Sequence, residues 1–194
     1  MGFVWRERQV RSAETARVNR LSFNARERKV LFVNARGQRF IEAGYPLGID
    51  VDLEGRGVAI ADLDQDGALD LVMRSVARKK LTYFHNEVGT RAHFLRVELV
   101  GTKSNGDAIG AVVRIVADGQ RQMRVKTAGS GFQGQSEGTL HFGLGATTQV
   151  GELSVRWPSG RQERFASLPA DHIVRIVEGE GKFTSRRPLG SRLQ

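Results

Sequence analysis

The chain of 194 residues contains no cysteine, only four prolines, and no apolar run long enough to cross a bilayer. The absence of cysteine excludes disulfides and thiolate metal ligands. It does not fix the compartment, because bound cations and core packing can replace disulfides outside the cell. Residues 1–8 lack the apolar segment of a secretory signal, so we expect no export signal within this chain.

Familiar catalytic signatures are also lacking. The sequence holds no G-x-S-x-G elbow and no P-loop, and its four histidines do not have zinc-ligand spacing. Residues 129–134 spell G-x-G-x-x-G, but a loop and a strand follow where a dinucleotide site needs a helix. His141 with Ser130 or Ser136 could pair a base with a nucleophile only through folded geometry. The sequence therefore predicts a protein that is not an enzyme.

The basic charge of the chain is spread along it rather than concentrated in a nucleic-acid motif. The formal net charge is +9 and the pI is about 10.7, values that would suit a partner with phosphates. However, no helix-turn-helix, zinc-finger or RNA-recognition pattern accompanies the arginines. We therefore do not expect nucleic acid as a partner. Attraction to an acidic polymer stays open as an alternative to a merely solvated basic surface.

What the sequence does contain is an acidic loop, D-x-D-x-D-G-x-x-D, at residues 62–70. Calcium takes about six to eight oxygen ligands, and carboxylates at alternating loop positions can point to one centre when a glycine permits a tight turn. An EF-hand is excluded, because its twelfth position needs a bidentate Glu and here holds Met73. The predicted Ca2+ ligands are the side chains of Asp62, Asp64, Asp66 and Asp70 and the carbonyl of Ala68. The alternative is a solvated acidic turn without metal.

Apolar segments on both sides make this a strand–loop–strand site. The arrangement resembles the FG-GAP or VCBS repeat of calcium-bearing β-propellers. Residues 56–64 are similar to the entry strand of such repeats, and residues 81–87 are similar to the Y-x-N-E strand that follows. A second strand that ends in Asn, similar to the one at residues 81–86, lies earlier, at residues 30–34. The resemblance implies one complete repeat and part of another, which is an incomplete propeller.

The second half resembles the ASPIC/UnbV domain. The matching motifs lie at residues 101–113, 128–132, 135–136, 140–145 and 155–160. Together the two resemblances identify an FG-GAP/VCBS repeat protein with a C-terminal ASPIC/UnbV domain, the cartilage acidic protein-like family. Members of that family are usually exported, which implies an extracellular or periplasmic location.

Alternation of apolar and polar residues independently predicts an all-β fold. Half-buried strands are predicted at residues 94–100, 112–116, 123–127, 153–157 and 173–177, a spacing that favours a sandwich or a barrel over parallel βαβ units; the family resemblance implies a β-sandwich-like domain. We expect four parts. They are a basic N-terminal segment (1–28), a repeat region with the calcium loop (29–90), an ASPIC/UnbV-like domain (91–180) and a basic flexible tail (181–194).

A polar, glycine-rich loop offers a second candidate site. Ser130, Phe132, Gln133, Gln135 and Ser136 could form a ligand-facing surface in which the aromatic ring stacks on a sugar. The alternative is that the glycines simply allow tight turns in β structure.

The function predicted from the sequence is a non-enzymatic calcium-binding interaction or scaffold module with a protein or glycan partner. Two alternatives stay open: an accessory or cofactor-independent cyclase or isomerase of natural-product biosynthesis, and an acidic-polymer binder. An incomplete propeller leaves strands such as residues 30–33 unpaired, so we expect self-association or a need for upstream repeats. Residues 6–20 could cover one edge as a helix.

Overall fold

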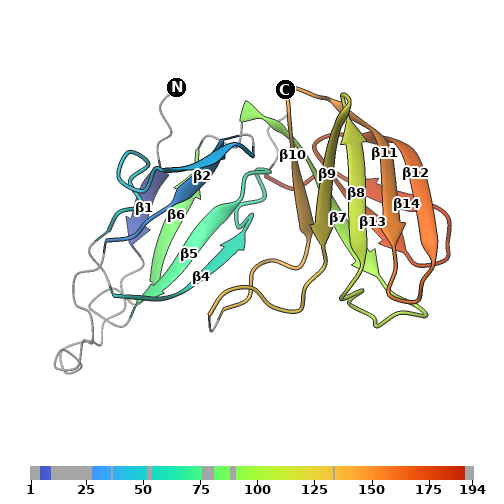
Figure 1. Ribbon diagram of the computed structural model, residues 1–194, viewed down its shortest axis with the longest axis horizontal. Helices are drawn as coiled ribbons and strands as arrows, with labels where there is room; N and C mark the ends of the chain where they lie inside the picture. Colours follow the sequence, from blue (N-terminus) through green and yellow to red (C-terminus); the bar gives the residue numbers. More distant parts are fainter. Residues whose placement is uncertain are drawn as a thin grey trace. The chain divides into compact units, whose positions relative to one another are not determined.

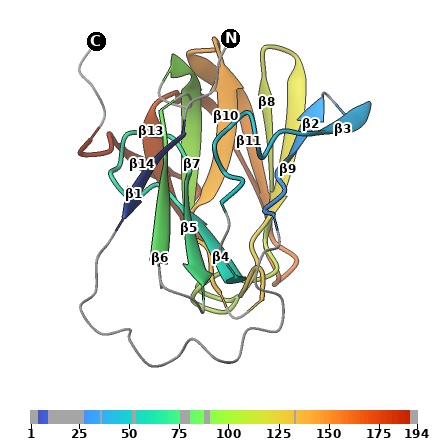
Figure 2. The same ribbon diagram turned by 90° about the vertical axis from the view of Figure 1, so that its left-hand side faces the viewer.

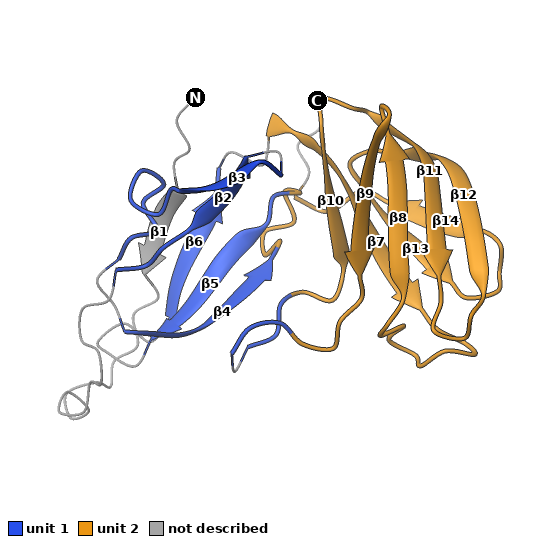
Figure 3. Ribbon diagram, viewed as in Figure 1, with its two compact units in different colours: residues 1–61, 68–89, 130–136 blue, residues 62–67, 90–129, 137–194 orange. Residues whose placement is uncertain are grey.

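The computed structural model describes residues 5–9, 28–35, 37–51, 54–75, 81–87, 91–132 and 134–190. The chain divides into two compact units, shown in Figure 3. Unit 1 comprises residues 1–61, 68–89 and 130–136, and unit 2 comprises residues 62–67, 90–129 and 137–194. Over the described ranges, no helix is long and apolar enough to cross a membrane.

Unit 1 contains a four-stranded antiparallel sheet and a separate hairpin. The sheet has the order β1 (Trp5–Gln9), β6 (Leu81–Asn86), β5 (Asp70–Ser75) and β4 (Gly55–Ala61), and its strands can be followed in Figure 2. The hairpin pairs β2 (Phe32–Ala35) with β3 (Arg39–Glu42). A propeller blade also has four antiparallel strands, so the sheet is compatible with the predicted repeat.

The N-terminal segment differs from its prediction. Residues 5–9 form a strand that pairs with β6, so the helix expected over residues 6–20 is wrong at its start. A strand satisfies the backbone hydrogen-bonding groups of the β6 edge, which a helix could only shield. Residues 10–20 lie outside the described residues.

The core of unit 1 is small. Its buried members are Leu47, Ile49, Met73 and Phe84, and Leu31, Ala43, Val51 and Leu71 pack against them. Met73 and Phe84 come from β5 and β6, while the remaining buried pair comes from the loop after β3. A core of this size gives little hydrophobic stabilisation.

Unit 2 is a β-sandwich, and its strands are labelled in Figure 1. One sheet has the order β10 (Leu140–Gly145), β7 (His93–Val100), β13 (His172–Val177) and β14 (Phe183–Arg186). The other has the order β12 (Gln162–Pro169), β11 (Gln149–Arg156), β8 (Val112–Ala117) and β9 (Gln120–Val125). The pair β7 and β13 is parallel, and the other pairs in these two sheets are antiparallel. The predicted all-β, sandwich-like fold is confirmed.

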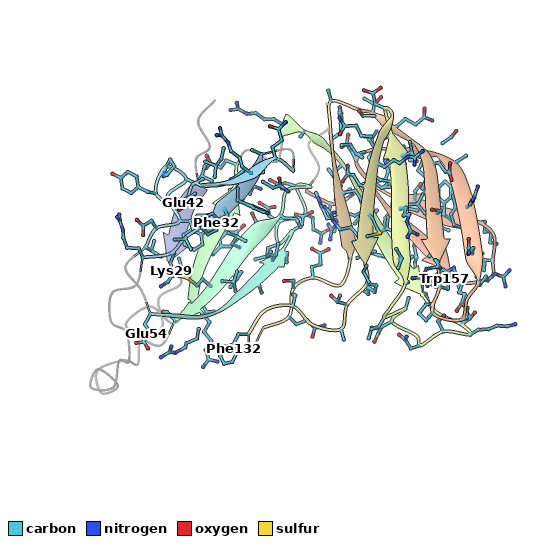
Figure 4. The ribbon with its side chains drawn as sticks, in the orientation of Figure 1. Lys29, Phe32, Glu42, Glu54, Phe132 and Trp157 are labelled. Atoms are coloured by element: carbon cyan, nitrogen blue, oxygen red, sulfur yellow. The ribbon has the colours of Figure 1, made fainter. Side chains whose placement is uncertain are left out.

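Alternating side chains of both sheets fill one continuous core. Leu95, Val97, Val113, Phe142, Leu153, Val155 and Ile176 are among its buried members. Trp157 also lies in this core, where Figure 4 labels it. Its indole Nε1 donates a hydrogen bond of 2.6 Å to Oε2 of Glu163. The same carboxylate accepts the backbone N–H groups of Gly179 and Gly181, so it joins the Trp157 motif to the loop before β14.

A second buried carboxylate explains two of the family-like motifs. Oε2 of Glu178 accepts the backbone N–H groups of Thr102, Lys103 and Ser104 at 2.8–2.9 Å. Its Oε1 accepts the hydroxyls of Ser104 and Ser159. Burial by itself raises the pKa of Glu178, but these hydrogen bonds outweigh it and lower the pKa to about 2. The motifs at residues 101–113 and 155–160 therefore meet at a carboxylate that the sequence analysis did not single out.

The C-terminal tail is more ordered than predicted. Residues 183–186 form β14, which pairs with β13, and Arg186 Nη2 lies 3.0 Å from Glu98 Oε1. Phe183 packs against the core with its ring edge-on to Phe165. The expected flexible tail from residue 181 is thus wrong over this strand, because a half-buried aromatic side chain and backbone pairing fix it to the sandwich.

Candidate metal centre

The acidic loop leaves β4 at Ala61 and reaches β5 at Asp70. Asp62, its first acidic residue, is only 6 % exposed. Its Oδ2 accepts hydrogen bonds from the backbone N–H of Gly67 at 3.2 Å and from Arg96 Nη1 at 2.8 Å. Its own backbone N–H donates to Glu137 Oε2 at 2.9 Å. The loop itself and Arg96 therefore hold the carboxylate of Asp62, and Glu137 holds its backbone.

The other oxygen of Asp62 lacks a partner. Oδ1 is buried, and no group in the described part of the chain donates a hydrogen bond to it. One carboxylate oxygen each from Asp62, Asp64 and Asp66 lie within 4.8 Å of one another. A buried acceptor left unsatisfied costs about 1–3 kcal/mol. These three side chains form a cluster that could hold a metal ion, and an ion there would satisfy the orphaned oxygen.

The charges around the cluster favour a cation. Asp62, Asp64, Asp66 and Glu137 contribute four carboxylates, whereas Arg96 contributes one guanidinium, whose Nη2 is hydrogen-bonded to Glu137. Burial raises the pKa of Asp62 to about 6, against the opposing influence of Arg96 and the Gly67 N–H, and Asp66 and Glu137 raise it further. The buried carboxylate is thus short of positive charge, which a divalent cation could supply.

Gly67 gives the loop its turn and its contact with the sandwich. Its φ is +95°, and a Cβ atom at this position would lie 2.0 Å from Cε1 of Phe94. Its carbonyl oxygen accepts a hydrogen bond of 2.9 Å from His141 Nε2. The rings of Phe94 and His141 stack with centroids 5.8 Å apart. Only glycine fits both this backbone conformation and this close approach.

His141 has a structural role at this loop. Burial lowers its pKa, and its Nε2 donates a hydrogen bond to the carbonyl oxygen of Gly67. This hydrogen bond occupies the nitrogen that faces the loop. The sequence left open that His141 acts as a base for Ser130 or Ser136. The observed bond to the Gly67 carbonyl instead gives His141 a structural role at the acidic loop.

Asp70 and Ala68 belong to unit 1 and are described there. Both are buried. Oδ2 of Asp70 accepts the Tyr83 hydroxyl at 2.9 Å, and Oδ1 accepts the backbone N–H of Asn86 at 2.8 Å. His85 Nδ1 lies 3.3 Å from Oδ1. Tyr83 and Asn86 of β6 therefore position the Asp70 carboxylate, while ligation of a metal by Asp70 and by the Ala68 carbonyl stays a prediction.

In the predicted ligand loop, the hydroxyls of Ser130 and Ser136 accept hydrogen bonds from backbone N–H groups of unit 1. Ser136 Oγ accepts the backbone N–H of Ile60 in β4 at 3.1 Å, and Ser130 Oγ accepts the backbone N–H of Ser136 at 3.2 Å. Phe132 is 68 % exposed and is labelled in Figure 4, and Gln135 is also exposed. Gln133 lies outside the described residues. The serines thus fasten the loop beside β4, and a ligand role for the loop stays a prediction.

Sequence reasoning found the three clustered aspartates but missed the residues that hold them. Arg96 and Glu137 lie 34 and 75 residues from Asp62 in the sequence. Arg96 stands at an ordinary polar position of the alternating strand β7, and no local pattern distinguishes it. The burial of Arg96 within β7 is visible only in the folded chain.

These features define an all-β protein with a β-sandwich and an acidic loop whose carboxylates could hold a cation. The model of the family described as "ASPIC and UnbV" matches residues 101–183, so this part of the chain is an ASPIC/UnbV domain. The match covers β8 to the start of β14. It confirms the predicted family resemblance of the second half. The FG-GAP resemblance of residues 29–90 is not tested by it and stays a prediction.

The chain is further similar to proteins named cartilage acidic protein 1. The Mus musculus protein is 31 % identical over 163 residues, which cover 79 % of this chain and 25 % of that protein. The Homo sapiens protein is 32 % identical over 160 residues, covering 78 % and 24 %. The Xenopus tropicalis protein is 36 % identical over 114 residues, covering 57 % and 17 %. The chain thus spans about a quarter or less of the length of these relatives.

Proposed function

We propose that the chain is a non-enzymatic interaction module whose acidic loop binds one calcium ion. The observation that carries this proposal is the orphaned Oδ1 of buried Asp62, which lies in a cluster with carboxylate oxygens of Asp64 and Asp66. The sequence adds the Ala68 carbonyl and Asp70 as further ligands. All of these donors are oxygens, which is the preference of calcium and magnesium rather than of zinc or copper.

Calcium fits such a donor set better than magnesium does. Magnesium demands a near-ideal octahedron and gives up its waters reluctantly, whereas calcium accepts irregular sets of oxygens. Here Asp62 is held by Arg96, Glu137 and the Gly67 N–H and cannot easily rearrange. A donor set that includes one fixed carboxylate therefore favours calcium, which tolerates more varied geometry.

The ion would act on structure rather than on chemistry. It would compensate the excess carboxylate charge around Asp62 and fix the loop between β4 and β5. A ligand that binds only the folded state stabilises it by about 2.7 kcal/mol at a hundred times its dissociation constant. Together with the similarity to cartilage acidic protein 1, this supports a stable binding or scaffold module with a protein or glycan partner, placed outside the cytoplasm.

Calorimetric titration of chelator-treated protein tests the calcium site. We expect one calcium per chain, weaker heat with magnesium, and at least tenfold weaker calcium binding in Asp64→Asn and Asp66→Asn. Asp118→Asn is the matched control, because Asp118 is also an exposed turn aspartate but lies in the hairpin between β8 and β9. Absence of heat in the parent protein, or equal affinity in all three variants, contradicts the proposal.

The alternative function, an accessory protein or enzyme of natural-product biosynthesis, makes predictions that the binding module does not make. A cyclase or isomerase role predicts that the gene lies among genes of a natural-product cluster and that the protein changes a small molecule. The hydrogen bond of His141 to the Gly67 carbonyl supports a structural role for this residue instead. We therefore place the binding module first.

A further inference from the structure

The outer face of the β12-β11-β8-β9 sheet carries a patch that the calcium site does not use. Its outward residues alternate with the buried core residues of the same strands. Four of them are arginines, Arg114, Arg121, Arg156 and Arg164, and one is Glu152. We call these five side chains and the surface between them the arginine face. All four arginines are exposed.

Strand pairing brings the arginines of this face together. Ser154 of β11 is directly opposite Arg114 of β8 on one side and Arg164 of β12 on the other. Residues directly opposite one another share a face of the sheet, and strands are about 4.8 Å apart. The two arginines thus flank Ser154 at about 10 Å from each other. Arg156, two residues along the same strand as Ser154, points to the same side.

The guanidinium groups of the arginine face are not paired with other side chains of the described residues. Among the residues that the structure describes, the side chains of Arg114, Arg121, Arg156 and Arg164 have no ion pair and no hydrogen bond, and neither does the side chain of Glu152. Elsewhere in unit 2, Arg96 and Arg186 are paired with carboxylates. Four free cations against one anion on one sheet face create a local positive potential.

The surface between these arginines is hollowed and partly apolar. A depression of about 420 Å³ is lined by Arg114, Arg121, Met123, Glu152 and Ser154, together with Val116. Met123 is 52 % exposed. The face therefore offers charge, a hydroxyl and an apolar floor side by side, a combination suited to a ligand that carries anionic groups on a ring with C–H surfaces.

We infer that the arginine face binds a linear acidic polysaccharide, with its sulfate or carboxylate groups on the arginines and a sugar ring over Met123 and Val116. This inference names the partner class of the proposed interaction module and does not depend on the calcium site. Single-stranded nucleic acid is the weaker match, because it needs aromatic stacking platforms. The outward positions of β8, β9, β11 and β12 hold no aromatic residue.

Heparin binding by the full chain, measured by titration at several salt concentrations, tests the inference. Arg114→Ser combined with Arg164→Ser should weaken binding at least tenfold and lower the slope of log affinity against log salt by about two, one for each lost contact. Glu152→Gln should strengthen binding, because it removes the single acidic side chain of the face. The matched control is Arg74→Ser combined with Arg175→Ser, which removes two exposed arginines of other sheets and should change affinity less than twofold.

Three results would overturn the inference. They are no binding by the parent protein at low salt, equal losses in the face variant and the control, and tighter binding of single-stranded DNA or polyglutamate than of heparin. Calcium binding is measured on the same preparations. If calcium binds but heparin does not, the polysaccharide inference is wrong and the calcium proposal stands. If heparin binds but calcium does not, the calcium proposal is wrong and the polysaccharide inference stands.

Discussion

Replacing Gly67 by alanine should destabilise unit 2 more than any comparable glycine substitution in an open turn. Two separate effects add. The φ of +95° is strained for an L-residue, which costs about 1–2 kcal/mol. In addition, the new Cβ would lie 2.0 Å from Cε1 of Phe94. This ring is 5 % exposed and stacked on His141, so its displacement adds about 1–3 kcal/mol of overpacking.

Gly160 provides a control for the backbone effect alone. Its φ is +90°, and a Cβ atom there would meet nothing within 4 Å. Gly160→Ala should therefore lose only about 1–2 kcal/mol, whereas Gly67→Ala should lose about 2–5 kcal/mol. The difference isolates the collision with Phe94. Urea unfolding in calcium-free buffer, followed by fluorescence, reports on unit 2 when all variants carry Trp5→Phe, so that buried Trp157 is the only tryptophan.

A third variant tests whether the collision is with Phe94 itself. Phe94→Leu opens space for the added methyl group, so Gly67→Ala with Phe94→Leu should be less destabilised than the sum of the two single variants. Equal stability losses for Gly67→Ala and Gly160→Ala would refute the argument that the loop packs tightly on the sandwich.

Two further predictions concern the sandwich. The pKa of Glu178 is lowered to about 2 from its ordinary 4.5, so its stabilising effect is present above pH 4.5 and is lost as the pH falls towards 2. Glu178→Gln should therefore flatten the pH dependence of the free energy of unfolding in this window. The control variant Glu180→Gln, at an exposed position, should not. In chemical denaturation, Phe183→Ala should lower the free energy of unfolding by about 1–2 kcal/mol, because it removes the edge-on contact with Phe165. The control variant Phe132→Ala should change it by less than about 0.5 kcal/mol. Unchanged stability in Phe183→Ala would show that β14 adds nothing to the sandwich.

Strands were predictable wherever alternation reflected burial. The predicted segments 94–100, 112–116 and 173–177 lie within β7, β8 and β13, and β11 contains residues 153–156 of the predicted 153–157, because each strand packs side chains into the core. The strand β14 was missed, since Phe183 is its only apolar residue. Its place is fixed by pairing with β13 and by packing on Phe165, which are long-range contacts that no local pattern encodes.

The acidic loop shows the same division between local and distant information. The spacing of Asp62, Asp64 and Asp66 was sufficient to predict that their oxygens approach one another, and the structure brings them within 4.8 Å. The spacing could not show that Asp62 is buried against Arg96 and Glu137. Arg96 belongs to β7 and Glu137 to the loop before β10, so only the folded chain reveals that the first predicted ligand is fixed and short of positive charge.

The hairpin of β2 and β3 carries the predicted tendency to associate. Phe32 is 57 % and Phe40 69 % exposed, and Val33 and Ile41 are exposed on the opposite face of the same hairpin; Figure 4 labels Phe32. A two-stranded hairpin is marginal in water without a covering surface, and apolar side chains on both faces favour burial against another chain. Light scattering over a wide concentration range should therefore show association that Phe32→Ser with Phe40→Ser lowers. The control Phe132→Ser with Leu189→Ser, which removes two equally exposed apolar side chains elsewhere, should leave it intact. Parent protein that stays monomeric at every concentration, or association that survives the hairpin variant, would show that this surface is covered within the chain.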